Sequence, residues 1–297
     1  MQHLSFAAAL GALTNATVWG LAWYPLKWLD AHGIASLWAT WFVFAGCTTA
    51  VLVARPSAAR LLWRHRASLG WLVFASGMTN ACFNTALATG DVVRAVLLFY
   101  LMPMWVVFLA RWLLAERVTP SAVGRMLFAL AGAALVLGEG RLRLPWPETS
   151  ADVLAIAAGF FFGLNNVLLR RHAATPDAAR ALAMFLGAVL IAPLVIGALA
   201  LAGRAPHFAP EGVAWVGVAV FTTMVLVGNL ALQYGAARLP ANVLSVLMLA
   251  EILVATGSSW AAGAARLGAG TWLGGACIVA ASLLAIFSRA APRAASN

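Results

Sequence analysis

Charge is scarce in this sequence. Only 9% of the 297 residues are Asp, Glu, Lys or Arg, whereas 63% are hydrophobic. A soluble domain carries about 25% charged residues, so this chain cannot cover a water-facing surface with polar groups. The composition therefore excludes a soluble globular protein. Acidic residues are the scarcer sign, with 9 Asp and Glu against 19 Lys and Arg and a formal net charge of +10.

Cysteine is scarce as well. The three cysteines, Cys47, Cys82 and Cys277, lie inside apolar segments, where they are expected to be small packed residues rather than a disulfide framework or a metal site. The five histidines fall at the ends of apolar segments or between them, and no pair of carboxylates or Cys/His cluster lies together. We therefore expect no metal, no cofactor and no enzymatic activity.

Long apolar runs make up most of the chain instead. Crossing about 30 Å of hydrocarbon takes about 20 residues in a helix, and two shorter runs can extend past flanking Arg side chains that reach the interface. We predict an all-α integral membrane protein with ten transmembrane helices, and the last-but-one run is broken only by Glu251. The ten runs are 4–26, 33–54, 67–90, 95–110, 126–138, 153–169, 181–203, 212–237, 239–265 and 267–288.

Two of these runs need comment. Run 4–26 has no basic segment before it and is longer than the apolar core of a typical signal peptide, so we interpret it as the first span. Run 95–110 contains Pro103. In a membrane bundle, neighbouring helices can satisfy the backbone groups that a proline leaves unpaired, so Pro103 predicts a kink in a membrane helix.

Basic residues predict the orientation. With a cytoplasmic N-terminus, the segments after the even-numbered runs hold 13 of the 19 Lys and Arg, and those after the odd-numbered runs hold 6. The positive-inside rule then places both termini in the cytoplasm. Because the basic residues lie in short loops between spans, we expect them to attract anionic lipid headgroups rather than nucleic acid.

The two halves of the chain are weakly similar. A shift of 149 residues aligns Asn80 with Asn229 and Asn84 with Gln233, and a shift of 150 aligns Asn15 with Asn165. Five spans per half is an odd number, so the second copy must enter the membrane from the other side. We predict two inverted five-helix repeats, 1–140 with spans 1 to 5 and 141–297 with spans 6 to 10, and a substrate site between them.

Three stretches resemble a known family. The sequences "RLPANVLSVLMLAEILVA" at 238–255 and "LLFYLMPMWVVFLARWLLAER" at 97–117, with "WG" at 19–20, resemble the EamA-type family of the drug/metabolite transporter superfamily. "FYLMP" at 99–103 and "FFFGLNNVLLRR" at 160–171 resemble its YddG-type exporters of aromatic and other amino acids. The resemblance implies ten helices in two inverted halves, cytoplasmic termini, and amino acid export across a bacterial inner membrane.

One position departs from that family. Members commonly have proline after the glutamate of the second half, where this chain has Ile252. We therefore expect the second half to lack the kink of the first.

Polar and aromatic side chains near the middle of spans are candidates for the substrate site, since they are costly against lipid and should face the bundle interior. Single amides could equally bond across helices and hold the bundle together. Glu251 could carry a proton, pair with a substrate ammonium, or serve only in packing. The candidate residues are Asn15, Trp19, Ser76, Asn80, Asn84, Phe99, Tyr100, Pro103, Phe162, Asn165, Asn166, Asn229, Gln233, Met248 and Glu251.

The leading functional hypothesis is a secondary transporter that exports small amphipathic metabolites, with amino acids first. A channel or facilitator for small polar solutes, or an exporter of drugs or other metabolites, stays open as an alternative. The expected partners are a small-molecule substrate and membrane lipid. Small residues at Gly270 and Gly274 and at Ala129 and Ala133 allow close helix packing within one protomer or in a homodimer.

Overall fold

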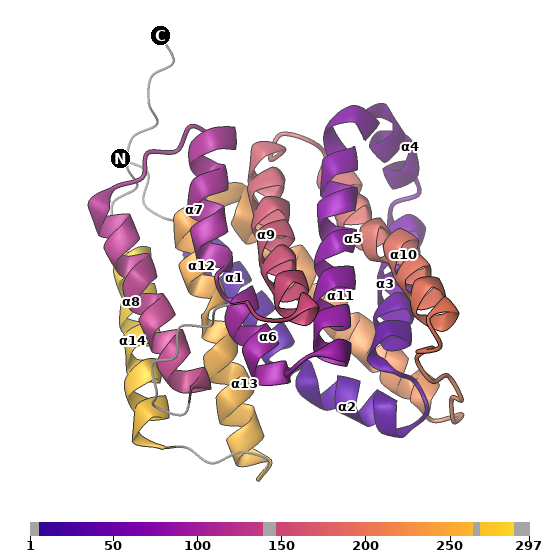
Figure 1. Ribbon diagram of the computed structural model, residues 1–297. Coiled ribbons are helices and arrows are strands. Elements are labelled where there is room, and N and C mark those ends of the chain that lie inside the picture. Colours follow the sequence, from indigo (N-terminus) through magenta and orange to yellow (C-terminus); the bar gives the residue numbers. More distant parts are fainter. Residues whose placement is uncertain (1–5, 139–146, 264–267, 288–297) are drawn as a thin grey trace.

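The computed structural model describes residues 6–138, 147–263 and 268–287, and in these residues the only regular elements are helices (Figure 1). The expectation of an all-α protein is confirmed. In chain order the helices are α1 (Phe6–Leu21), α2 (Trp23–Ala31), α3 (Ser36–Ala54), α4 (Ser57–Arg64), α5 (Arg66–Thr89), α6 (Val92–Phe99), α7 (Met102–Leu113), α8 (Pro120–Leu137), α9 (Ser150–Arg171), α10 (Asp177–Leu201), α11 (Ala214–Arg238), α12 (Ala241–Met248), α13 (Ala250–Ala261) and α14 (Ala269–Ile286).

Eight helical segments of the described chain are long and apolar enough to cross a membrane. They are α1 with α2, α3, α6 with α7, α8, α9, α10, α11, and α12 with α13. The other two expected spans coincide with α5 and α14. Helix α5 has 24 residues but carries a polar stripe, and the apolar part of α14, Ala269–Ala285, is shorter than the eight.

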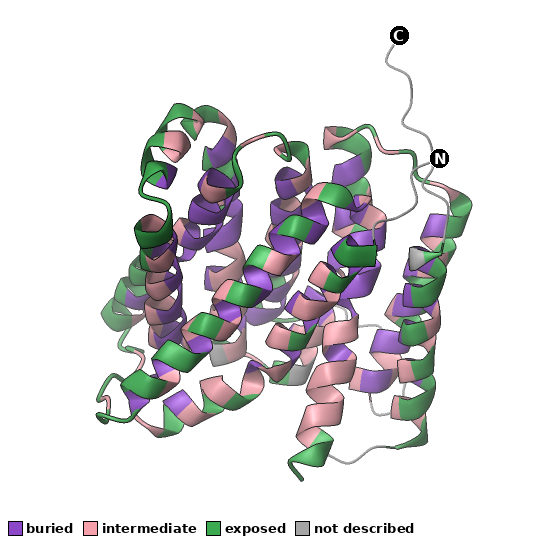
Figure 2. Cartoon of the chain, turned by 180° about the vertical axis from the view of Figure 1, so that it is seen from behind, coloured by how far each residue is buried: buried purple, intermediate pink, exposed green. Residues whose placement is uncertain are grey.

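The distribution of side chains is that of a protein surrounded by lipid. Large hydrophobic residues project from the outer helices, among them Phe108 at 77% exposure, Trp112 at 79% and Leu194 at 70%. Asparagines lie inside, with Asn15 and Asn166 exposed by no more than 1%. Figure 2 shows exposed residues along the outward sides of the helices and buried ones toward the interior. Asparagine side chains are therefore buried inside the bundle and aromatic side chains lie on its outer surface, as expected for a protein in hydrocarbon.

Glycines bring three helix pairs together. A Cβ on Gly11 of α1 would lie 2.6 Å from the carbonyl oxygen of Ala231 of α11, and Gly77 of α5 meets the backbone of Gly187 of α10 in the same way. Gly132 of α8 and Gly274 of α14 likewise face each other's carbonyl oxygens. Gly274 therefore makes its close helix contact within one protomer, and not with a second copy of the chain.

Two of the spanning segments are interrupted. Between α6 and α7, the N–H of Leu101 bonds to the Leu98 carbonyl at 3.2 Å, and that of Met104 bonds to Leu101 at 3.0 Å. Both bonds join residues three apart, and Pro103 cannot donate to the carbonyl of Phe99. The kink predicted from Pro103 therefore falls at an observed break in the helix.

The second interruption corrects an expectation. Helix α12 ends at Met248 and α13 begins at Ala250, with three-residue bonds on both sides of Leu249. The expectation that the second half lacks a break, based on Ile252, is wrong. Leu249 is fully buried, so packing, and not a missing N–H, sets this turn.

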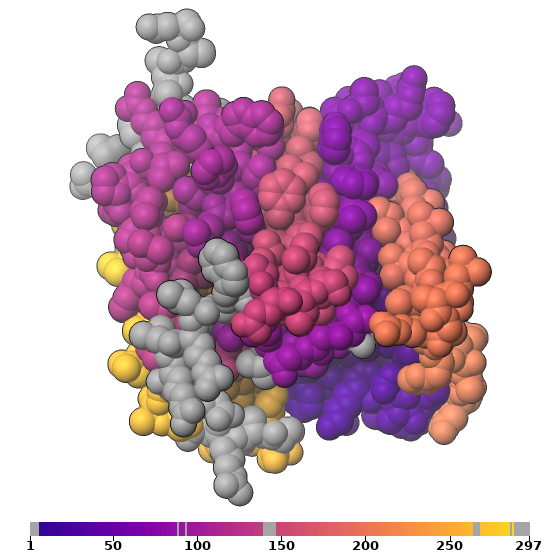
Figure 3. Space-filling view, in the orientation of Figure 1, coloured from indigo at the N-terminus to yellow at the C-terminus, as the bar shows by residue number. Residues whose placement is uncertain are grey.

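Helix α9 lies next to both interrupted segments. It packs against α5, α6 and α7, and also touches α11 and α12. Side chains of α9 fill the face between α7 and α5 in Figure 3, so the space between those ribbons is no groove. Any ligand site beside α9 must therefore lie on its inner side.

Candidate functional site

A central cavity lies where eight helices converge. Its volume is about 80 Å³, enough for several water molecules, so a larger ligand requires the lining side chains to move. It is lined by Trp19 from α1, Phe44 from α3, Ser76, Thr79, Asn80 and Phe83 from α5, Phe99 from α6, Phe162 and Asn165 from α9, Met184 from α10, Asn229 and Leu232 from α11, and Glu251 from α13.

Eight of the fifteen residues proposed from the sequence line this cavity. The eight are Trp19, Ser76, Asn80, Phe99, Phe162, Asn165, Asn229 and Glu251. Sequence patterns did not single out the other lining residues, Phe44, Thr79, Phe83, Met184 and Leu232. Of these, Thr79 and Phe83 lie beside Asn80 on α5, so the helical period of that stripe could have included them.

The remaining seven residues lie elsewhere. Asn84 donates from Nδ2 to Thr40 Oγ1 at 3.3 Å, and Gln233 donates from Nε2 to the backbone oxygen of Asp177 at 2.9 Å. Pro103 and Met248 pack in the interior. Asn15 and Asn166 are buried, and their amide atoms have no hydrogen-bond partner among the described residues. The seventh, Tyr100, contacts the cavity indirectly.

Tyr100 acts on the cavity through Glu251. The Tyr100 hydroxyl lies near the Glu251 carboxylate and interacts with it electrostatically, and this brings α6–α7 of the first half next to α13 of the second. Glu251 is the only acidic residue among those that line the cavity. One carboxylate therefore contacts both interrupted segments and the cavity.

Two amides in the cavity expose acceptor atoms. Asn80 donates from Nδ2 to the Ser76 carbonyl at 3.0 Å, and Asn229 donates to the Val225 carbonyl at 2.9 Å. Each amide nitrogen thus bonds to its own helix, which leaves both amide oxygens without a partner in the described part of the chain. With Glu251, these oxygens make the polar side of the cavity rich in acceptors.

Aromatic rings form the apolar side. The Phe99 ring centroid lies 4.7 Å from that of Phe83 and 5.6 Å from that of Phe162, and Trp19 adds a ring from α1. No Lys or Arg is among the lining residues. The cavity is therefore suited to a ligand with hydrogen-bond donors or positive charge at one end and an apolar body at the other.

The carbonyl of Phe99 faces α9 rather than the cavity. A Cβ on Gly159 would lie 2.6 Å from the Phe99 oxygen, so the backbones of α6 and α9 touch at this point. This carbonyl is the group that Pro103 leaves without an intrahelical donor. The backbone group freed at the break in α6–α7 is therefore packed against Gly159 of α9.

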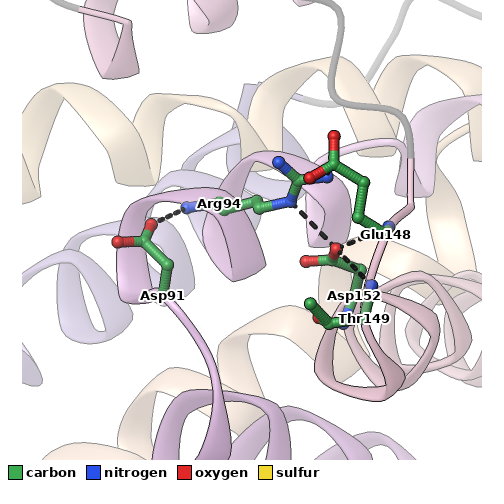
Figure 4. A network of polar contacts seen from close by, with 5 residues as sticks. All are labelled: Asp91, Arg94, Glu148, Thr149 and Asp152. Carbon is green, nitrogen blue, oxygen red and sulfur yellow. Dashed lines mark hydrogen bonds and ion pairs between the residues drawn. The ribbon is translucent and has the colours of Figure 1, made fainter.

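Ion pairs join α9 to the first interrupted segment at both ends. Figure 4 shows one end, where Arg94 Nε lies 2.9 Å from Asp152 Oδ2, and a second nitrogen of Arg94 lies 3.2 Å from Glu148 Oε1. Asp91 caps α6 by accepting from the backbone N–H of Arg94 at 2.8 Å. Thr149 and Asp152 form a capping box at the start of α9, a sequence signal at 149–152 that could have located this network.

A further ion pair lies at the other end of α9. Arg170 Nε lies 2.6 Å from Glu116 Oε1, and Glu116 Oε2 accepts from the backbone N–H of Ala241 at 3.2 Å. Glu116 thereby links the segment after α7, the end of α9 and the start of α12. Among the described residues, no group of three or more His, Cys, Asp and Glu side chains could hold a metal ion.

Comparison with known proteins gives a match to one family over part of the chain and a similar fold over nearly all of it. Residues 6–138 match the EamA-like transporter family. A solved protein described only as "Crystal structure of protein" is similar with a TM-score of 0.74 and 23% identity, over 94% of this chain and 96% of that one. A search of curated proteins finds no match. The match and the apolar helices together support a multi-pass membrane protein.

Proposed function

From the premise that the match of residues 6–138 supports an EamA-like transporter of small molecules, we propose that this protein exports small amphipathic metabolites, with amino acids first, by alternating access through the central cavity. The YddG-type exporters are the part of the family that the sequence resembles. Export takes place across a bacterial inner membrane, and both termini are cytoplasmic.

The observation that carries the proposal is the division of the cavity into two sides. Glu251 and the amide oxygens of Asn80 and Asn229 can accept hydrogen bonds from a substrate ammonium. Trp19 and the phenylalanine cluster can enclose an apolar side chain. An amino acid with an aromatic or aliphatic side chain carries both an ammonium group and an apolar body in one small molecule.

Ten spans in two inverted halves are part of this proposal. Helices α5 and α14 then cross the membrane too, α5 with its polar stripe turned to the cavity. In this repeat α1 of the first half corresponds to α9 of the second, and α5 corresponds to α11. Packing supports the repeat, because α1 contacts α11 and the corresponding pair, α9 and α5, is also in contact. The pair α8–α14 turns into itself. The boundary between 140 and 141 lies outside the described residues.

Transport by purified protein in proteoliposomes tests the proposal. Vesicles loaded with an unlabelled amino acid should accumulate the same labelled amino acid from outside, and a panel of aromatic, aliphatic and charged amino acids should rank the apolar ones first. Saturable counterflow supports a carrier. Flux that rises in proportion to concentration without counterflow indicates a channel, and absence of flux for the whole panel points to other metabolites.

A further inference from the structure

A second cavity lies beside the central one, between α3, α10 and α11. Its volume is about 410 Å³, larger than that of the central cavity. Sequence patterns placed one of its residues, Gln233, with the central site. The cavity is lined by Ala50, Val51, Ala54 and Arg55 of α3 and its C-cap, Asp177, Ala178 and Ala181 of α10, and Leu226, Leu230, Gln233 and Tyr234 of α11.

Both signs of charge line this cavity. Arg55 has no ion pair or side-chain hydrogen bond to any residue that the structure describes. Asp177 pairs through Oδ1 with Arg180, which is 1% exposed, and its other carboxylate oxygen has no described partner. The cavity therefore offers the unpaired guanidinium of Arg55 and one unpaired carboxylate oxygen of Asp177.

Gln233 adds an acceptor whose orientation is determined by its neighbour. Its Nε2 donates to the backbone oxygen of Asp177 at 2.9 Å. Reversing the amide would bring two oxygens together, so the nitrogen belongs on that side. The Oε1 atom is then left buried without a partner among the described residues, although Gln233 is only 3% exposed. An unpaired buried acceptor is costly unless a ligand or water supplies a donor.

The second cavity shares three helices, α3, α10 and α11, with the central one. On α11, Gln233 follows Asn229 by four residues, and on α10, Ala181 precedes Met184 by three. One helical turn is about 5.4 Å, so the linings of the two cavities lie about one turn apart on these helices. Arg55 follows α3 at the end of the bundle that the basic residues place in the cytoplasm.

We propose that this second cavity is a loading site for a zwitterionic substrate on its way from the cytoplasm to the central cavity. The substrate carboxylate binds Arg55, its ammonium binds Asp177 and Gln233 Oε1, and its apolar side chain lies along Leu226 and Leu230. This inference rests on the proposed function. The headgroup of an anionic phospholipid suits Arg55 but not the nearby acceptor oxygens, so the mixed charges favour a zwitterion.

Uptake of labelled L-phenylalanine into inside-out membrane vesicles tests this site, since these vesicles present the cytoplasmic face to the medium. Arg55→Gln should raise the half-saturation concentration about tenfold, the usual effect of losing one hydrogen bond to a charged group, and leave the maximal rate near wild type. Arg60→Gln removes another exposed arginine, one that lines neither cavity, and should match wild type.

Competition by half-substrates adds a second measurement. Phenylpropionate lacks the ammonium, and phenethylamine lacks the carboxylate. Arg55→Gln should weaken competition by phenylpropionate, and Gln233→Met, which keeps the side-chain length, should weaken competition by phenethylamine. Arg55→Gln should purify at wild-type yield, because Arg55 is exposed. Gln233→Met is similar in volume but loses the donor to the Asp177 backbone oxygen, so its uptake is compared per amount of folded protein.

The outcomes separate this site from the proposed function. Absence of saturable phenylalanine uptake by the wild type overturns the proposed function and this site with it. Saturable wild-type uptake that Arg55→Gln leaves unchanged, or that Arg60→Gln alters equally, overturns the loading site alone. An Arg55→Gln effect that appears only in reconstituted vesicles containing phosphatidylglycerol, and not in those of phosphatidylcholine, assigns Arg55 to an anionic lipid headgroup and also overturns the loading site.

Discussion

The two interrupted segments of the bundle are similar in backbone but differ in how they are held. Segment α6–α7 is joined to α9 by charged groups at both ends, through Arg94 with Asp152 and through Glu116 with Arg170. Segment α12–α13 packs against α1. Between its outer end and the α1–α2 segment, the described residues show one neutral bond, from Trp23 Nε1 to Ser258 Oγ at 3.0 Å.

This difference shows where the bundle can move. Hydrogen bonds between charged groups are about twice as strong as neutral ones, so α6, α7 and α9 should move as one body. Segment α12–α13 is attached to this body where α12 begins, because the N–H of Ala241 donates to Glu116. Its outer end, held by the neutral bond from Trp23 to Ser258, should move more easily. Glu251 of α13 lies near Tyr100 of the other segment, beside the cavity. Relative motion of the two segments should therefore displace this cavity carboxylate.

The largest effect is expected from removing the charge at that junction. Glu251→Gln should lower counterflow of a labelled amino acid at least about tenfold, because a charged acceptor for the ammonium is lost. Tyr100→Phe keeps the carboxylate and removes only one donor, so its loss should be smaller. Glu251→Gln with normal counterflow but no uphill transport would instead make Glu251 a proton carrier.

Breaking the charged contacts of α9 should lower the thermal stability of the protein. Asp152→Ala removes the partner of Arg94 and the capping group of α9, and should lower the melting temperature of detergent-purified protein by about 5 °C. Ser258→Ala, the matched change in the other half, should lower it by about 1–2 °C, because only one neutral bond is lost. Equal shifts for the two variants would contradict the difference between the halves.

The two halves should contribute alike to the acceptor side of the cavity. Asn80→Leu and Asn229→Leu each remove one unpaired amide oxygen, and each should lower transport about threefold at normal yield. Asn84→Leu is the control, since Asn84 bonds to Thr40 outside the cavity and should affect yield rather than transport. If all three variants lose yield and transport together, the amides serve packing only.

Sequence patterns predict the helices and half of the site, for clear physical reasons. A bilayer requires long apolar runs, so most spans could be located by composition alone. The stripe of Ser76 and Asn80 faces the cavity because helical period places polar groups on one side. Gln233 occupies the same kind of stripe, yet it lies one turn too far along α11 and reaches the second cavity.

Other features depend on contacts that no local pattern contains. Met184 and Phe44 line the cavity because α10 and α3 happen to pack there, and nothing in an apolar run distinguishes them from lipid-facing neighbours. Glu116 lies 54 residues from Arg170, so its role depends on tertiary packing. The break at Leu249 likewise forms without a proline, where the residue type predicts a continuous helix.

The smallest effect is expected from Pro103→Ala, and the break at Leu249 is the reason. Since packing alone interrupts α12–α13, packing of the Phe99 carbonyl against Gly159 should hold the break in α6–α7 after the proline is lost. An alanine there supplies an N–H, but its acceptor at Phe99 is turned toward α9. We expect a maximal transport rate within about twofold of wild type and an unchanged half-saturation concentration.

Gly159→Ala is the contrasting variant, because its methyl group would push α9 away from the same carbonyl, and it should reduce the rate further. A Pro103→Ala protein that folds normally but transports tenfold more slowly would show that the proline itself sets the hinge, and that the two interrupted segments work by different means.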